Sequence, residues 1–259
     1  MSRFFITCKD IVTPGSITIT GDGVNHIKNV LRHKKGDILV LCDGNGTDYR
    51  VSIESLEKGQ VVTRIMDVSR NTMEPPVEVT LFQGIPKSDK MDYIIQKTVE
   101  LGIKRIVPVI TERTVFRPVR KDVMEKKKER WQRISLEAAK QCNRGIIPEV
   151  ETPLGFKESL KYFDCFDLVL VPYEEEKQRS IGAFIKELKQ GKINTNRNGA
   201  GIRSAAILIG PEGGFSEEEA ALAAKSGGIL VSLGPRILRT ETAGLVVLAI
   251  LMYELGDMG

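Results

Sequence analysis

The chain has 259 residues, of which 41% are hydrophobic and 28% are charged, and its formal net charge is +4. This balance is typical of a globular protein with a buried core, and the length allows one large domain or two smaller ones. The longest apolar run, AGLVVLAILMYEL at 243–255, is shorter than the ~20 residues that span a bilayer, and no charged-then-apolar leader begins the chain. These features argue against a membrane or secreted protein, so we expect one that acts in the cytoplasm.

The cysteines and histidines do not form the pattern of a metal site. The two histidines, His26 and His33, lie away from any pair of cysteines, and the four cysteines are widely separated, at positions 8, 42, 142 and 165. We therefore expect reduced thiols, with neither a bound metal nor a disulfide.

The first 70 residues contain short strand-like segments separated by turn residues such as DGNG. One helix-like segment, VNHIKNVLRHK at 24–34, interrupts them. This pattern predicts a small β-barrel. The chain then passes through Pro75 and Pro76, which favour an extended joint over a helix. We therefore expect two domains, 1–72 and 73–259.

From residue 77 onward, strand-like and helix-like segments alternate along the chain. Such alternation is typical of a parallel sheet with helices on both faces, so the second domain should be of the α/β class. Strands are expected at 77–85, 106–110, 168–173, 205–210 and 229–234, and helices at 88–102, at 124–142, at 181–190 and after each of the last two strands.

Positive charge is concentrated in one segment. Residues 87–144 hold 16 lysines and arginines but only 8 aspartates and glutamates. A localised excess indicates a nucleic-acid partner better than net charge does, although the run EKKKER at 125–130 is by itself typical of a solvated helix face. The basic residues that favour an RNA or DNA partner are Lys87, Lys90, Arg113, Arg117, Arg120 and Arg144.

The sequence LIGPEGGFSEEE at 208–219 contains a glycine-rich turn between a strand and a helix. Ser216 and Glu219 have the spacing of a capping box, so the helix should begin directly after Ser216. Ligands of parallel α/β sheets bind beyond the carboxyl ends of the strands, and Gly213 and Gly214 allow the backbone to approach a ligand closely. The turn is therefore a candidate binding loop.

The acidic residues in and after this turn indicate the kind of ligand. The sequence matches neither of the common phosphate-binding patterns, GxxxxGK[ST] and GxGxxG. Glu212 and the acidic run 217–219 suit the positive end of a helix, but they would repel a phosphate. We expect a neutral or cationic ligand, such as a nucleoside or an onium centre. The alternative is that the turn only connects the strand to the helix.

A second loop, SLGPRILRTETAG at 232–244, follows the last expected strand. Thr240 is a candidate cap for the last helix. Arg236 and Arg239 stand near Glu241 in an otherwise apolar region, where buried charges are costly unless they are paired. The arginines either form a structural ion pair with Glu241 or hold an anionic substrate and stabilise developing negative charge. The two loops together predict a cofactor pocket beside a substrate pocket.

With KSDKMDYIIQKTVELG at 87–102 and EAAKQCNR at 137–144, the two loops make up four spaced motifs. This combination resembles the ribosomal RNA small-subunit methyltransferase E family, which belongs to the SPOUT class of knotted methyltransferases. The likeness covers nearly the whole chain. The sequence departs from the family pattern at Gly244, where the family usually has alanine.

The resemblance implies a fold and an activity. The expected fold is an α/β domain whose parallel sheet forms a deep trefoil knot, preceded by a PUA-like β-barrel that helps to grip RNA. The expected activity is transfer of a methyl group from S-adenosylmethionine to N3 of one uridine in 16S ribosomal RNA, free or in the 30S particle. The resemblance also implies a homodimer.

The resemblance further implies the residues of the site. The cofactor would be held by Pro172, Leu208, Gly210, Pro211, Glu212, Gly213, Gly214, Leu233, Gly234, Ile237, Leu238, Arg239 and Thr240. The RNA would be contacted by Arg3, Arg32, Lys87, Lys90, Arg117 and Arg144.

For catalysis, Arg239 and then Arg236 are the candidates to stabilise the uridine anion that forms when N3 loses its proton. The C-terminal domain has no histidine, so Glu212 or Glu241 is the candidate proton acceptor. Two other classes of function stay open at this point. One is an RNA-binding module without catalysis; the other is a small-molecule α/β enzyme that uses a nucleotide, against which the missing phosphate patterns argue.

Overall fold

A computed structural model describes residues 3–7, 10–115, 121–193 and 201–258, and these residues form two compact units. The first unit comprises Met1–Glu74 together with Ala139–Ile147, and the second comprises Pro75–Ala138 together with Pro148–Gly259. The first division along the chain falls between Glu74 and Pro75, two residues after the expected domain boundary.

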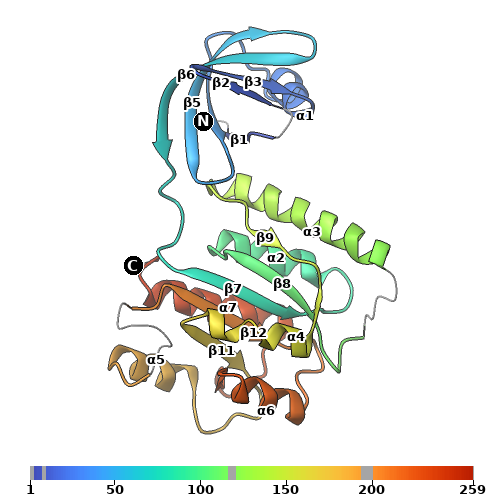
Figure 1. Ribbon diagram of the computed structural model, residues 1–259, viewed down its shortest axis with the longest axis vertical. Helices are drawn as coiled ribbons and strands as arrows, with labels where there is room; N and C mark the ends of the chain where they lie inside the picture. Colours follow the sequence, from blue (N-terminus) through green and yellow to red (C-terminus); the bar gives the residue numbers. More distant parts are fainter. Residues whose placement is uncertain (1–2, 8–9, 116–120, 194–200, 259) are drawn as a thin grey trace. The chain divides into compact units, whose positions relative to one another are not determined.

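The first unit is built on a curled six-stranded sheet (Figure 1). The alternating side chains of Ile17 and Ile19 are buried against Leu39, Val51 and Val61, which gives the unit a core of its own. All strand pairs are antiparallel except β1 with β4. The order is β1-β4-β5-β6-β3-β2, with β1 Arg3–Phe5, β2 Ile11–Thr13, β3 Ser16–Thr20, β4 Ile38–Cys42, β5 Thr47–Leu56 and β6 Gln60–Arg70.

The expected helix-like segment of this unit forms a short α-helix, α1 (Asp22–Asn25), that continues into a π-helix at His26–Val30. Ile27 is fully buried under the sheet, which explains why the strands are interrupted here. The predicted interruption is therefore confirmed, whereas the short strand β2 was not among the predicted segments.

The segment Ala139–Ile147 belongs to the first unit, although the sequence analysis placed it in the second domain. Its anchor is Glu74, whose carboxylate accepts hydrogen bonds from Arg144 Nη2 at 2.7 Å and from the backbone amides of Gly145 and Ile146 at 3.0 Å each. Arg144 is only 3% exposed. A buried guanidinium requires a carboxylate partner, and that partner lies 70 residues earlier in the chain.

The second unit contains the predicted parallel sheet. Its strand order is β10-β8-β7-β12-β11-β13, with β9 beside β8, and every pair in it is parallel. The strands are β7 Glu78–Gly84, β8 Arg105–Ile110, β9 Glu149–Val150, β10 Leu154–Gly155, β11 Leu168–Pro172, β12 Ser204–Ile209 and β13 Ile229–Val231.

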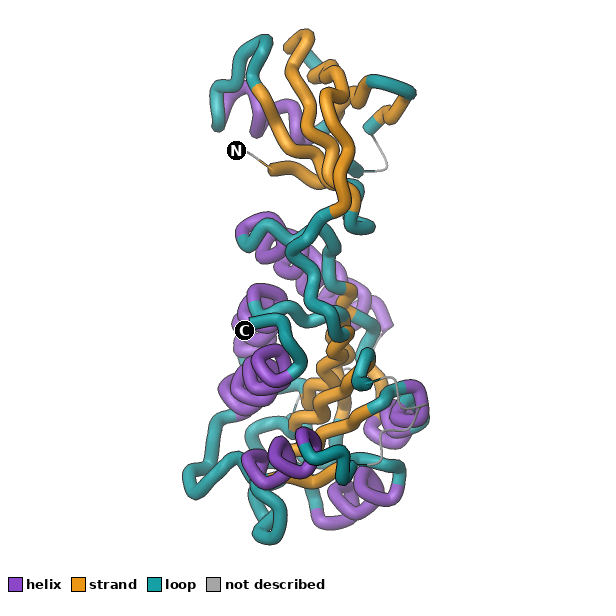
Figure 2. Tube along the Cα trace, turned by 90° about the vertical axis from the view of Figure 1, so that its left-hand side faces the viewer, coloured by secondary structure: helices purple, strands orange, loops and turns teal. Residues whose placement is uncertain are grey.

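Helices cover both faces of this sheet, as Figure 2 shows in an edge-on view. Phe82 packs with Phe156 and Phe163 on one face, whereas its neighbour Leu81 points toward Gly244 of the last helix on the other. The helices are α2 Lys90–Glu100, α3 Lys121–Gln141, α4 Phe156–Leu160, a 3₁₀ turn Phe163–Cys165, α5 Ile181–Lys189, α6 Glu217–Lys225 and α7 Thr240–Glu254.

One face of α2 is apolar and buried. Met91, Ile94 and Ile95 are at most 2% exposed, and the chain leaves the helix at Gly102, whose φ of +91° favours glycine. Helix α7 packs beside α2 and against β12. The strand pairings do not by themselves establish the trefoil knot, which stays a prediction. None of the helices in the described ranges has the length and apolar character needed to cross a membrane.

Candidate active site

A cavity of about 420 Å³ lies at the carboxyl ends of β11, β12 and β13. Because β11 lies between β12 and β13 in the sheet, the loops that follow these three strands meet at one edge. The lining residues are Lys90, Pro172, Tyr173, Glu174, Ile209, Gly210, Pro211, Glu212, Gly214, Phe215, Ser232, Leu233, Gly234, Pro235, Arg236, Ile237, Leu238, Arg239, Thr240 and Ala243.

The cavity brings together all of the expected cofactor residues except Leu208 and Gly213. Leu208 is fully buried in the core cluster between the sheet and α4, because side chains alternate along β12. Gly213 packs against the side chain of Arg113. The carbonyl of Gly213 accepts a hydrogen bond from Arg113 Nη1 at 2.8 Å, and a Cβ added to Gly213 would lie 3.1 Å from Arg113 Cβ. Neither residue faces the cavity.

The loop after β12 depends on close approaches between backbones. A Cβ on Gly84, at the end of β7, would lie 2.6 Å from the nitrogen of Pro211. Gly214 has a φ of +66°, and a Cβ there would overlap the carboxylate of Glu174. Side chains at these two positions would therefore push the loop away from its neighbours.

The expected capping box at the start of α6 is present. The Ser216 hydroxyl accepts a hydrogen bond from the Glu219 amide at 3.3 Å, and the Glu219 carboxylate accepts one from the Ser216 amide at 3.2 Å. The same carboxylate accepts a second hydrogen bond, from the amide of Glu112 at 2.8 Å. The box thus fixes the end of the glycine-rich loop and also the segment that follows β8.

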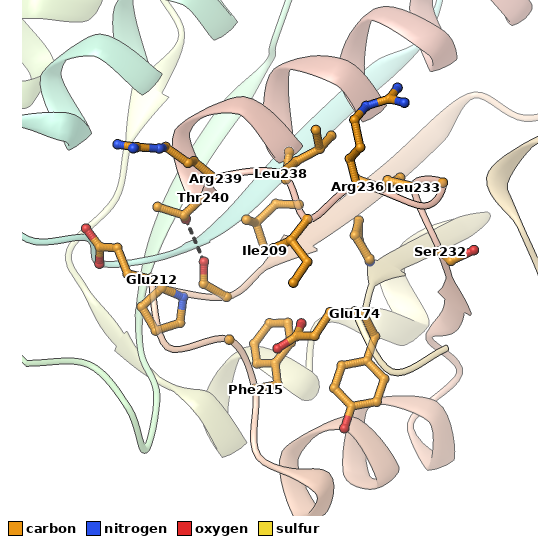
Figure 3. A pocket seen from close by; sticks show the side chains of 18 of the residues that line it. Glu174, Ile209, Glu212, Phe215, Ser232, Leu233, Arg236, Leu238, Arg239 and Thr240 are labelled. Carbon is orange, nitrogen blue, oxygen red and sulfur yellow. Dashed lines mark hydrogen bonds between the residues drawn. The ribbon is translucent and has the colours of Figure 1, made fainter. Parts of the chain in front are cut away.

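Thr240 ties the second loop to the first. Its hydroxyl donates to the carbonyl of Gly210 at 2.6 Å (Figure 3). It also accepts a hydrogen bond from Nε2 of the buried Gln83 at 2.9 Å. Thr240 is the first residue of α7 and not its cap, since Arg239 takes the cap position without a side-chain bond. The expected cap was therefore wrong, because the hydroxyl is used across the cavity.

An ion cluster closes one side of the cavity. Lys90 Nζ lies 3.0 Å from Glu212 Oε1 and 3.2 Å from Glu241 Oε2. Glu241 thus pairs with Lys90, whereas a pair with Arg236 or Arg239 was one of the two alternatives that the sequence left open. The hydrogen bond to Glu212 is the main cause of a raised Lys90 pKa. Lys90 is therefore part of the cavity wall, and its expected contact to RNA stays a prediction.

Glu212 also holds the loop before α2. Its carboxylate oxygens accept hydrogen bonds from the backbone amide of Lys87 at 3.1 and 3.2 Å. Burial raises the pKa of Glu212, but hydrogen bonds from its own amide, from the Lys90 ammonium and from the Lys87 amide outweigh burial and lower the pKa overall. The carboxylate is therefore ionised at neutral pH.

The charged side chains of the cavity differ in direction. Figure 3 shows the guanidinium groups of Arg236 and Arg239 extending away from the cavity, whereas the carboxylate of Glu174 points into it. Both arginines are exposed, and Ile237 between them is 88% exposed. The interior of the cavity thus presents negative charge and apolar surface, and its rim presents positive charge.

The expected RNA contacts have different surroundings. Arg144 is buried against Glu74, and Arg3 is bonded through both terminal nitrogens to Asp48, with its side chain 10% exposed. These two arginines are used inside the first unit, which is a correction to the expectation. Arg32 and Lys87 are exposed. Arg117 and Arg120 lie outside the described residues.

Sequence reasoning missed several lining residues. Tyr173 and Glu174 follow Pro172 directly, so the rule that ligands bind beyond strand ends could have included them. Phe215, Ser232 and Pro235 lie in the two loops predicted to form the pocket, but they were not singled out. Ile209 in β12 and Ala243 in α7 had no such signal, because only the packing of α7 over β12 brings them to the cavity. The missed residues are Tyr173, Glu174, Ile209, Phe215, Ser232, Pro235 and Ala243.

Comparison with known proteins identifies the class. Residues 73–252 match the model of an RNA methyltransferase domain, and residues 19–66 match that of an RNA methyltransferase PUA domain. The two matches fall on the parallel α/β sheet with its cavity and on the curled sheet, respectively. The chain therefore combines a methyltransferase domain with a PUA domain.

Relatives and solved structures give the family. The ribosomal RNA small subunit methyltransferase E of Bacillus subtilis is 36% identical, over 98% of this chain and 97% of that protein. The enzyme of the same name from Neisseria gonorrhoeae, solved bound to S-adenosyl methionine, has a TM-score of 0.83 and 30% identity over 100% of both chains. A methyltransferase from Legionella pneumophila, solved with bound cofactor SAM, has a TM-score of 0.79 and 32% identity, covering 97% of this chain and 96% of that one.

The chain belongs to the ribosomal RNA small subunit methyltransferase E family. The resemblance inferred from the four motifs is thereby confirmed, as is the combination of a parallel α/β sheet with a PUA-like unit.

Proposed function

We propose that this protein transfers a methyl group from S-adenosylmethionine to N3 of a specific uridine in 16S ribosomal RNA. The observation that carries the proposal is the cavity at the ends of β11, β12 and β13, which is walled by acidic and apolar side chains. We assign methyl transfer to the α/β domain expected at residues 73–259, and RNA gripping to the PUA-like domain expected at residues 1–72.

The residues of the cavity suit this cofactor. S-adenosylmethionine supplies a methyl group activated by a sulfonium and also carries an ammonium group, so a wall with the carboxylates of Glu174 and Glu212 matches its charge. The side chains of Ile209, Phe215 and Leu238 offer apolar surface for an adenine ring. Sites for small molecules typically measure roughly 300–1,000 Å³, and the cavity of about 420 Å³ falls in that range.

The rim arginines are the candidates for the substrate. When N3 of uridine loses its proton, negative charge spreads to the two ring carbonyl oxygens, and a nearby guanidinium stabilises it. Arg239 and Arg236 are exposed beside the cavity, so an RNA base lying over the opening is within their reach. We assign this role first to Arg239, which directly precedes the Thr240 bridge, and second to Arg236.

Glu212 is better suited to shaping the cavity than to taking the proton. Its lowered pKa makes its carboxylate a weak base, and its oxygens already accept hydrogen bonds from Lys87 and Lys90. Glu241 is held by the same lysine. We therefore attribute the rate mainly to positioning of N3 against the methyl group and to the arginines.

A second copy of the chain is the proposed partner. Helix α7 is apolar nearly all round, whereas a helix that packs on one side only normally carries a polar outer face. Tyr253 on this helix is 62% exposed. A homodimer formed over α7 would cover the partly exposed side chains of Leu245, Val246, Ala249, Ile250 and Tyr253. Light scattering after size-exclusion chromatography should give twice the chain mass, and the chain mass alone would contradict this proposal.

Methylation of defined RNA tests the proposed activity. The protein is incubated with labelled S-adenosylmethionine and either free 16S ribosomal RNA or 30S particles, and the modified nucleotide is mapped by mass spectrometry. We expect a single N3-methyluridine. In the cell, we place the reaction in the cytoplasm, where ribosomes are assembled. RNA binding without methyl transfer would favour the noncatalytic module, and binding of a phosphorylated nucleotide in place of S-adenosylmethionine would favour the small-molecule enzyme.

A further inference from the structure

Lys90, at the start of α2, joins two walls of the cavity. Its Nζ lies 3.0 Å from Glu212 in the loop after β12 and 3.2 Å from Glu241 in the first turn of α7. All three side chains are partly shielded, with exposed fractions of 30%, 27% and 18%. Ion pairs that are partly shielded from water are less screened than those on an open surface.

Both carboxylates lie within 3.2 Å of the same ammonium group, so they are close to each other. Like charges at this separation repel each other, and the repulsion grows as water is excluded. Glu212 and Glu241 belong to separate loops, and the Thr240–Gly210 hydrogen bond of 2.6 Å is a second tie between these loops. Without the lysine charge, the repulsion would act directly against that tie and open the cavity.

We propose that Lys90 is a positioning residue that sets the spacing of the two cofactor loops. This inference rests on the proposed function, since it concerns the site in which S-adenosylmethionine would bind. It assigns to Lys90 an effect on cofactor affinity, whereas the charge pattern of the sequence favoured a contact to RNA. Lys90 acts through Glu212 and Glu241 and needs no contact with the reacting atoms.

Helix α2 offers a matched control. Lys97 is exposed to a similar degree, 35%, and its Nζ lies 2.8 Å from Glu100 of the same helix. Its ion pair is therefore local and joins no separate elements. A comparison of Lys90→Met with Lys97→Met thus holds the helix, the residue type and the charge change constant.

The experiment measures the Kd for S-adenosylmethionine by calorimetry, the KM for RNA at saturating cofactor, and the melting temperature of the cofactor-free protein. We expect K90M to raise the Kd about tenfold, the equivalent of roughly 1.4 kcal/mol, and to leave the RNA KM within about twofold. K97M should change neither quantity. K90R should recover most of the affinity, because a guanidinium can also bridge two carboxylates.

A double substitution tests the physical cause. Adding E241Q to K90M removes one of the two repelling charges, so the double variant should bind the cofactor more tightly than K90M alone. If the repulsion between the carboxylates is not the cause, the changes that K90M and E241Q make to the cofactor binding free energy will simply add. That result would contradict the inference.

Other results would also overturn the inference. An unchanged cofactor Kd with a raised RNA KM in K90M would make Lys90 an RNA contact. Equal losses of affinity in K90M and K97M, in step with lowered melting temperatures, would reduce the effect to general destabilisation. In both cases the unaltered protein still binds S-adenosylmethionine, whereas failure of the unaltered protein to bind it would refute the proposed function itself.

Discussion

The two units use their charged side chains in opposite ways. In the first unit, Arg3 pairs with Asp48 and the buried Arg144 pairs with Glu74, so each guanidinium has its carboxylate inside the unit. At the cavity of the second unit, one lysine faces two carboxylates, and the arginines stand exposed at the rim. The number of basic residues in a segment therefore says little about function, whereas the arrangement of charges around a cavity says much.

The largest expected effect is a loss of rate on replacement of Arg239, one of the exposed arginines at the rim of the cavity. Replacing Arg239 by methionine should lower kcat for methyl transfer about 100- to 1,000-fold, the range found when one donor to a developing anion is lost. The cofactor Kd and the melting temperature should change little, because the side chain extends away from the cavity. Single-turnover kinetics measure the chemical step, and Arg236→Met serves as the comparison, with a smaller loss. A normal rate in Arg239→Met would remove this arginine from the mechanism.

The buried pair of Arg144 with Glu74 in the first unit should contribute to stability. Replacing Arg144 by methionine leaves the Glu74 carboxylate without its guanidinium partner, in surroundings where that side chain is 18% exposed. The free energy of unfolding should fall by about 3 kcal/mol, as it does when one partner of a buried pair is removed. Urea denaturation measures this change, and Arg32→Met, at an exposed position, is the control. If Arg144→Met instead keeps full stability and loses RNA affinity, Arg144 works as an RNA contact after all.

The start of α6 could be predicted from the sequence because its signal is local. Ser216 and Glu219 are three residues apart, and their capping box forms as predicted. The partners of charged residues could not be predicted, because Arg144 meets a carboxylate 70 residues away and Lys90 meets two that lie more than 100 residues away. Only the strand order, in which β7 lies beside β12, brings Lys90 to the cavity.

Glu174 brings a negative charge to the cavity of the second unit. Its carboxylate points into the cavity, so Glu174→Gln removes negative charge but keeps the shape of the side chain. The Kd for S-adenosylmethionine should rise about fivefold, close to 1 kcal/mol. S-adenosylhomocysteine lacks the sulfonium charge, so its Kd should rise less, and Glu175→Gln is the neighbouring control. An equal change for both ligands would place Glu174 away from the sulfonium.

The smallest expected effect concerns a position without charge. Gly244 lies inside α7, and an added Cβ would meet Gln83, Ile209 and Leu81 at 3.6 to 3.7 Å, which is ordinary contact. Gly244→Ala should therefore stabilise the protein by about 0.5 to 1 kcal/mol, because alanine restricts the unfolded chain and favours a helix. Thermal unfolding measures the change. A loss of stability would mean that the space beside Gly244 is needed.

We propose that the three loops beyond β11, β12 and β13 form the site of S-adenosylmethionine in this chain. A crystal structure of the protein grown with the cofactor tests it most directly. The account predicts cofactor density enclosed by Glu174, Ile209 and Leu238, with Lys90 still bridging Glu212 and Glu241. Cofactor bound elsewhere on the protein, with these loops filled by their own side chains, would contradict it.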